Sequence, residues 1–395
     1  MIRAPLERAN ALTSMKRDDL ENLRKPYSQG DSGCLDDQFA AALGFDCSQV
    51  ALLFNEIFQD LDERSYGVGW WAPHPGTSRR ILISDYFLQC VASVRTNLVE
   101  AKLHLHETLD YRDQESGFIT KAFKMGRKEK LPADLPPRLS AFDDLPRWMA
   151  QLHEIGFFRA IAGALDCMGA TVVGVVGLPL SILKANLAKA RKELGRLSKP
   201  KTDGEHLQAE FARLLACKIQ SAGPKGWLNW ATDFRNMVVH RGRRLQLVQL
   251  LPKETQVLGP DGRPVWRIRA ALQLPQEPHL SDVEMFLHTA SPPVLTEDAE
   301  RTLTGLFGTA VRFINETSSE LLKVWKARRN RPDLVVQPKQ QWPGDPSVRS
   351  SDFPGYNPGT VEYNPAQFKI DKLTFRRLMA AALLNDAPAK WRSFD

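Results

Sequence analysis

A chain of 395 residues with 43% hydrophobic side chains is long enough to bury a substantial core, and its length indicates two or three structural units. The 53 Lys and Arg residues outnumber the 46 Asp and Glu residues, and the formal charge of +7 favours a polyanionic partner such as nucleic acid over a basic one. Five scattered cysteines without a Cys-x-x-Cys pair exclude the usual zinc and dithiol motifs and predict a cytoplasmic, reducing environment.

The first 79 residues are expected to form an N-terminal extension that is partly helical. The opening 25 residues are charged throughout and lack the apolar core of a secretory signal. A short helix is predicted from Cys47 to Leu61, and the Gly- and Pro-containing run from Tyr66 to Pro73 predicts a loop.

A long amphipathic helix is predicted from Ile81 onward. Its apolar residues recur at steps of four and three, which places them on one helix face: Phe87, Val91, Val94, Leu98, Ala101 and Leu105. Residues 111–145 contain a basic run and several prolines, so we expect an exposed connector there.

A second helix is expected to begin near Pro146 and to end at Gly177 and Pro179. Its apolar part, residues 161–183, approaches the length that spans a bilayer. Asp166 and the glycines in this stretch favour a helix buried in a protein bundle, because a charge is costly in lipid and glycine allows close packing. The sequence therefore predicts no membrane association.

Three further helices are predicted in the middle of the chain, at residues 181–195, 203–220 and 227–250, with Asp203 as a candidate N-cap. The turn signal Gly-Pro-Asp-Gly within residues 255–274 then predicts a β-hairpin.

A last long helix follows the hairpin, with Thr296 as its cap and seven apolar or small residues in register: Leu303, Phe307, Ala310, Ile314, Thr317, Leu321 and Val324. Residues 327–395 are rich in proline and are expected to form a C-terminal extension with a short helix at 372–384.

The predicted helix at 227–250 carries the best candidate for chemistry. At 100° per residue, Asn229, Asp233, Asn236, His240 and Arg243 or Arg244 form a polar stripe, and Trp227, Trp230, Phe234 and Val238 lie opposite.

Two residues of this helix suit RNA cleavage. A neutral imidazole at His240 can take a proton from a ribose 2′-hydroxyl, and the planar guanidinium of Arg235 can bind a phosphate that gains charge. The two positions lie about 140° apart on an unbroken helix, so they converge only at a cleft or across a symmetric dimer. Asn236 lies one turn before His240.

The spacing alone is weak evidence, because Arg147 and His153 in the preceding helix also fit it. The 235–240 segment differs in having Asn236 directly after the arginine and further arginines at 241, 243 and 244. We therefore assign Arg235, Asn236 and His240 as candidate catalytic residues, and Asp233, Arg241, Arg243 and Arg244 as candidate substrate-binding residues.

The segment DFRNMVVHRGRR, preceded by an apolar helix and followed by a long closing helix, resembles the HEPN superfamily and its Arg-x4-6-His signature. The resemblance implies a helical bundle over residues 80–326, with the 111–145 connector and the 255–274 hairpin as insertions. It also implies a homodimer that cuts RNA without a metal or cofactor, in the manner of toxins and antiphage effectors, with a regulatory or antitoxin protein as a further partner. The expected fold is mainly α with a small hairpin.

Alternatives remain at each point. The same cleft could bind a nucleotide, an RNA or a protein without catalysis, or the chain could be a helical scaffold. Asp233 orients His240 or neutralises an arginine. The basic residues 323–331 form either an RNA-guiding surface or a solvated helix end. His104 and His106 point to opposite sides of their helix and are poor metal ligands as a pair.

Overall fold

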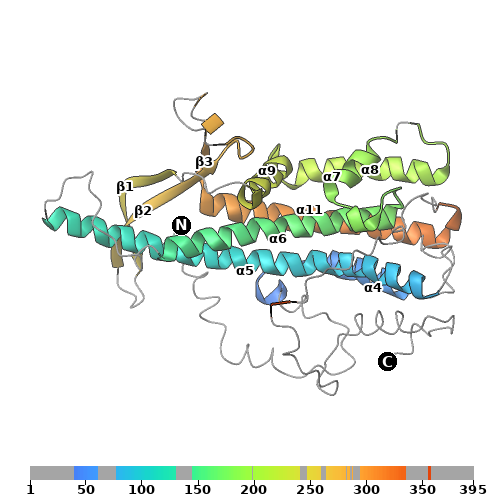
Figure 1. The fold of residues 1–395 in the computed structure, drawn as a ribbon, viewed down its shortest axis with the longest axis horizontal. Coiled ribbons are helices and arrows are strands. Elements are labelled where there is room, and N and C mark those ends of the chain that lie inside the picture. Colours follow the sequence, from blue (N-terminus) through green and yellow to red (C-terminus); the bar gives the residue numbers. More distant parts are fainter. Residues whose placement is uncertain are drawn as a thin grey trace, which may run out of the picture. The chain divides into compact units, whose positions relative to one another are not determined.

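A computed structural model describes most of the helical part of the chain. The described residues are 40–60, 77–129, 145–197, 199–240, 247–258, 264–281 and 294–334, with a few isolated positions beyond them. Over these residues the fold is mainly α-helical with one small antiparallel sheet, which confirms the predicted class (Figure 1). The predicted loop at 66–73 and the predicted helix at 372–384 lie outside the described residues.

The chain divides into two compact units, each built from three separate segments. Unit 1 comprises Met1–Phe45, Leu98–Ala162 and Gly226–Gly308, and unit 2 comprises Asp46–Asn97, Gly163–Lys225 and Thr309–Asp395. Three long helices contribute residues to both units: α5 (Thr77–Glu129), α6 (Leu145–Val176) and α11 (Ala299–Asn330).

Unit 1 also contains the helix that carries the Arg-x4-His segment and the whole sheet. The helix is α9 (Trp227–His240). Strands β1 (Leu247–Leu258) and β2 (Pro264–Pro275) form the antiparallel hairpin that the sequence predicted, and β3 (Val294–Asp298) pairs with β2 (Figure 1).

Unit 2 adds several shorter helices. They are α4 (Ser48–Gln59), the 3-10 turn η1 (Ile182–Lys184), α7 (Leu187–Leu194), α8 (Asp203–Ala222) and the 3-10 turn η2 (Pro332–Leu334). The N-cap of α8 is Thr202 rather than the predicted Asp203. Its hydroxyl accepts from Glu205 N while the Glu205 carboxylate accepts from Thr202 N, a capping box.

The predicted apolar registers of the two longest helices are confirmed. All residues of the two apolar registers, Phe87 to Leu105 and Leu303 to Val324, are buried. Apolar burial at about 25 cal/mol per Å² is the main favourable contribution to folding, so these two stripes hold the bundle together.

Several element boundaries differ from the prediction. The helix predicted at 181–195 is a 3-10 turn, η1, followed by α7 from Leu187 to Leu194. Helix α5 continues to Glu129, so residues 111–129 are helical and not part of a connector. Helix α9 ends at His240 and residues 247–250 belong to β1, so the predicted helix to Leu250 was wrong there. Thr296 lies in β3, and the carboxylate of Asp298 accepts from Glu300 N at the true start of α11.

Glycines allow close packing at the end of α6, as the sequence predicted for this stretch. A Cβ on Gly174 would lie 2.1 Å from the Phe87 ring, and one on Gly169 would lie 2.1 Å from Leu187 N. Gly177 ends the helix at φ +71°, a conformation that glycine adopts readily. Helix α6 is long and apolar enough to cross a membrane, but 72% of its most apolar window is buried within the protein, as in a core helix.

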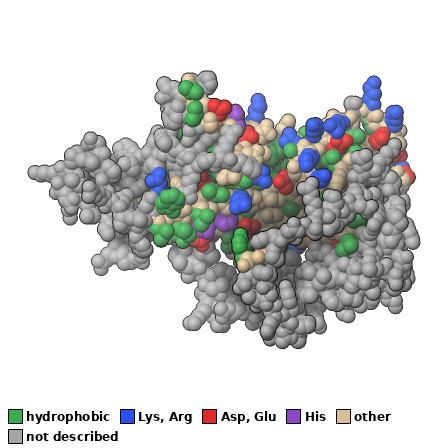
Figure 2. Space-filling view, viewed as in Figure 1, with side chains coloured by type: hydrophobic (Ala, Val, Ile, Leu, Met, Phe, Trp, Pro, Cys, Tyr) green, Lys and Arg blue, Asp and Glu red, His purple; other side chains and the backbone are tan. Residues whose placement is uncertain are grey.

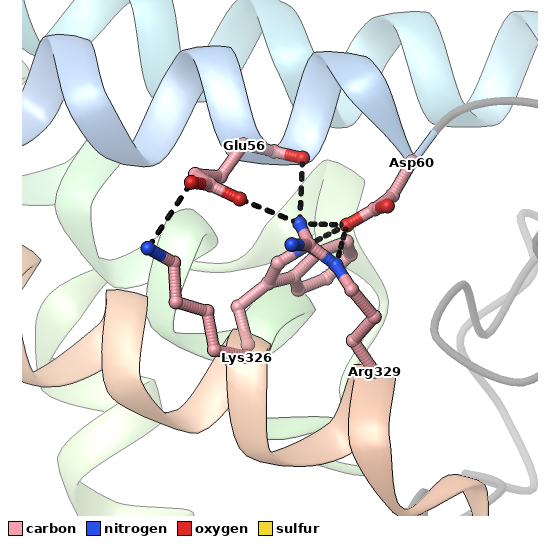
Figure 3. Close-up of polar contacts among 5 residues, drawn as sticks. Glu56, Asp60, Lys326 and Arg329 are labelled. Atoms are coloured by element: carbon pink, nitrogen blue, oxygen red, sulfur yellow. Dashed lines mark hydrogen bonds and ion pairs between the residues drawn. The ribbon is translucent and has the colours of Figure 1, made fainter.

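An ion-pair network joins α4 to α11 within unit 2 (Figure 3). Arg329 contacts the carboxylates of Glu56, at 2.7 Å, and Asp60, while Lys326 lies 3.1 Å from Glu56. The Trp325 indole donates to Asp60 at 2.7 Å. The hydrogen bond from Arg329 is the main cause of a lowered pKa at Glu56, and Lys326 adds to it.

We expect this network to make unit 2 sensitive to acid. Because the pKa of Glu56 is lower in the folded chain, its stabilising effect is present above the ordinary carboxyl value of 4.5 and is lost as pH falls through the lowered pKa. Glu56→Gln should cost about 0.5–1 kcal/mol at pH 7 and less at pH 3.5, measured by urea unfolding. Glu210→Gln, at an exposed position of α8, serves as the control; an equal cost of Glu56→Gln at both pH values would contradict the prediction.

Candidate functional site on helix α9

Helix α9 is fixed in unit 1 by aromatic packing against α6. The Phe234 ring stacks on Phe158 with centroids 4.0 Å apart, and Trp230 meets Phe158 edge-on at 5.9 Å. The Trp230 indole also donates to the Pro275 carbonyl at the end of β2, at 3.0 Å. These contacts fix the orientation of α9 about its own axis and so determine which of its side chains face outward.

The inner face of α9 is apolar: Trp227, Leu228, Ala231, Phe234 and Met237 are buried. Asn229 and Asn236, both from the predicted polar stripe, are exposed, and Asp233 is half-buried. Trp230 and Val238, predicted to lie on the packed side, are half-buried. For these residues the predicted apolar and polar faces of α9 are observed, while His240, Arg243 and Arg244 of the predicted stripe have side chains outside the described part of the chain.

Arg235 lies between the two faces and is half-buried. Its Nη1 donates to Oδ1 of the neighbouring Asn236 at 3.0 Å. A guanidinium has five N–H donors, so this bond leaves several for another acceptor while it restricts the side chain. The arrangement suits an arginine held ready for a phosphate oxygen.

His240 is the last residue of α9, and its side chain lies outside the part of the chain that is described. Arg241, Arg243 and Arg244 also fall outside the described residues. The structure therefore brings together Arg235 and Asn236, with Asp233 on the same helix, and leaves the position of the imidazole relative to the guanidinium as a prediction.

The described residues offer neither a metal centre nor an activated cysteine. No group of three or more His, Cys, Asp or Glu side chains in the described part of the chain is placed to hold a metal ion. Burial raises the pKa of Cys90 to about 12 and that of Cys167 to about 11, so both thiols are protonated at neutral pH and are poor nucleophiles.

A histidine pair in unit 1 was not predicted from the sequence. Nδ1 of His104 on α5 lies 3.0 Å from Nδ1 of His153 on α6, so one ring must carry a proton there and the other must accept it. Tyr111 stacks on His153 with centroids 5.7 Å apart. A Cβ on Gly156 would lie 2.4 Å from the His104 ring, so glycine makes room for it. The pairing depends on the register between two helices, which no pattern within either helix reveals.

This pair should make unit 1 less stable in mild acid. Burial, and then the neighbouring His153, lower the pKa of His104, although Glu100 and Glu107 act in the opposite direction. The unfolded chain then takes up a proton near pH 6.5 while the folded chain does so only at lower pH, so stability falls as pH drops below 6.5. His104→Gln should flatten this loss in urea unfolding between pH 7.5 and 5.5. The exposed-site variant His206→Gln should not, and equal pH dependence in both would contradict the prediction.

Comparisons of the chain with protein-family models, with characterised proteins and with solved structures gave no match. Helix α9 itself combines an apolar face fixed by Phe158, an outward polar face, and an arginine bonded to the asparagine beside it.

Proposed function

We propose that this protein is an endoribonuclease of the HEPN type, which cleaves RNA without a metal at a site built on α9. The observation that carries the proposal is the pair of half-buried Arg235 and exposed Asn236, bonded at 3.0 Å on a helix whose opposite face is anchored in the core.

In the proposed reaction His240 takes the proton of a ribose 2′-hydroxyl. The 2′ oxygen then attacks the adjacent phosphorus, and Arg235 binds the non-bridging oxygens as they gain charge. The bond from phosphorus to the 5′ oxygen breaks, that oxygen takes a proton from solvent water, and His240 returns the proton it accepted to the solvent. The products are a 2′,3′-cyclic phosphate on one fragment and a 5′-hydroxyl on the other.

A second copy of the chain is part of the proposal. Arg235 and His240 are about 140° apart around the helix axis, so one α9 does not direct both toward the same phosphate unless the arginine bends around the helix. Two α9 helices related by a two-fold axis would offer Arg235 from one chain beside His240 from the other. Mixing Arg235→Ala and His240→Ala chains should then restore activity that each lacks alone.

The test is incubation of labelled single-stranded RNA with the protein in excess EDTA, followed by analysis of the ends of the products. We expect fragments that end in 2′,3′-cyclic phosphate. RNA that binds but stays intact would favour the alternative of a non-catalytic nucleotide- or RNA-binding module, and would refute the proposed cleavage.

A further inference from the structure

A strongly basic surface lies in unit 2, away in sequence from the α9 segment. Residues 184–201 contain seven basic residues and a single acidic one, an excess of six in a chain whose whole formal charge is +7. All seven are exposed: Lys184, Lys189, Arg191, Lys192, Arg196, Lys199 and Lys201. In Figure 2, Lys and Arg side chains gather at the upper right, where Figure 1 labels α7 and α8. We call residues 184–201 the basic segment.

The local fold presents these charges to solvent. Helix α7 buries Leu187, Ala190 and Leu194, which recur at steps of three and four on its inner face. Its N-cap Asn186 accepts from Lys189 N at 2.8 Å, which fixes the start of the helix. The basic side chains are left on the outer face of a helix that is anchored on its other side.

Carboxylates do little to neutralise this surface. Within the described residues, the ion pair recorded in the basic segment is the one between Arg196 and Glu193, at 2.6 Å. Lys189 Nζ donates to the Lys184 carbonyl at 2.7 Å, which uses one of its three N–H donors and cancels no charge.

The basic residues at 323–331, predicted as either an RNA-guiding surface or a solvated helix end, are instead paired with acidic residues or buried. Lys323 pairs with Glu320 at 3.0 Å, Lys326 and Arg329 pair with Glu56, and Arg331 pairs with Asp203 at 2.9 Å. Arg328 is buried. These cations are paired with carboxylates or buried within unit 2. The basic segment therefore carries more unpaired positive charge than residues 323–331 do.

We propose that the basic segment binds the phosphate backbone of nucleic acid. Lysine and arginine that neutralise phosphates release counterions, which gives binding without sequence preference and with a strong dependence on salt. No aromatic residue stands in the segment on which bases could stack, so contact with phosphates rather than bases is expected. An anionic membrane is the weaker match, because such helices insert an apolar face and α7 turns its apolar face into the core.

The inference deepens the proposed function and rests on it only for the choice of RNA over DNA. The probe is therefore a fluorescent single-stranded RNA with 2′-O-methyl groups, which lacks the attacking hydroxyl and cannot be cleaved by transesterification. Binding is measured by anisotropy over a range of salt concentrations. A DNA of the same length and vesicles with anionic lipid are measured in parallel.

The test variant is the full chain with Arg191→Gln, Lys192→Gln and Lys199→Gln, none of which makes an ion pair in the described structure. The control carries Arg159→Gln, Lys225→Gln and Arg301→Gln, which are exposed outside α7 and α8 and remove the same charge. We expect the test variant to lower the slope of log K against log salt by about two units and the control to change it little.

Equal loss of RNA binding in both variants would mean that only net charge matters, and would overturn the proposal. Binding to vesicles that exceeds binding to RNA and DNA, and that the test variant abolishes, would also overturn it in favour of a membrane surface. The 2′-O-methyl RNA is not cleaved whether or not the site on α9 is active, so failure of the cleavage proposal does not affect this binding test.

Discussion

Replacing Arg328 with methionine is expected to lower the free energy of unfolding of the protein by about 2–4 kcal/mol. The Arg328 side chain is 1% exposed, and its guanidinium donates to the carbonyls of Val175 and, at 2.8 Å, Val176. These are carbonyls at the end of α6, where a helix leaves acceptors without partners and carries partial negative charge. No basic residue stands in the last turn of α6, so a cation from α11 takes this role.

The burial of Arg328 lowers its pKa to about 10, so the side chain stays charged at neutral pH and binds the carbonyls as a cation. Arg328→Met removes two charge-assisted hydrogen bonds. The Val176 carbonyl keeps its bond from Gln208 at 3.0 Å, while the Val175 carbonyl loses its bond from the guanidinium. The removed cost of burying a charge offsets part of the loss.

Urea unfolding compares this variant with Lys323→Met, which changes an exposed residue of the same helix and should stay within about 0.5 kcal/mol of the wild type. Arg328→Lys should fall between the two, since lysine keeps the charge but cannot span both carbonyls. Equal stability of Arg328→Met and Lys323→Met would show that the buried guanidinium does not hold the end of α6.

Replacing Arg235 with alanine is expected to lower the rate constant for RNA cleavage by about 10²–10³-fold. Removal of a donor that binds the phosphate as charge develops acts on the chemical step, so kcat should fall more than KM rises. Arg235→Lys should recover part of the rate, since an ammonium supplies the charge without the planar fork.

The matched control for Arg235→Ala is Arg147→Ala. Arg147 is also followed by a histidine at a similar spacing, and it is exposed near the start of α6. Circular dichroism establishes that both variants fold. If Arg147→Ala lowers the rate as much as Arg235→Ala does, the effect comes from general loss of positive charge and the assignment of Arg235 fails.

Helix periodicity was the most successful guide from the sequence. The apolar positions from Phe87 to Leu105 and from Leu303 to Val324 are buried in the structure. An apolar stripe on a helix is buried whichever element packs against it, so the pattern alone predicts the buried face. The hairpin was also found, since Gly-Pro-Asp-Gly favours a turn through local backbone preferences.

The sequence was a poorer guide where the outcome depends on distant partners. The run Leu247–Leu251 is apolar enough for a helix or a strand, and pairing with β2 decides for the strand. The charges at 323–331 look solvated in the sequence, but Glu56 and Asp60 on α4 reach them only in the folded chain. The His104–His153 contact likewise depends on how α5 and α6 are aligned.

The sequence predicted some features of the candidate site and missed others. The outward position of Asn236 and the inward position of Phe234 follow from the period of α9 and were predicted. The hydrogen bond between Arg235 and Asn236 was not, because adjacent helix residues do not normally face each other and the long arginine stem has to turn back. That bond places the Arg235 guanidinium beside the Asn236 amide.

The most direct measurement is the rate at which His240→Ala cleaves labelled single-stranded RNA in EDTA, beside the wild type and Arg147→Ala. The proposed role of the imidazole as the base predicts a fall of about 10²–10⁴-fold for His240→Ala alone. Cleavage by His240→Ala at the wild-type rate, or cleavage by the wild type that stops when EDTA is added, would contradict a metal-independent site on α9.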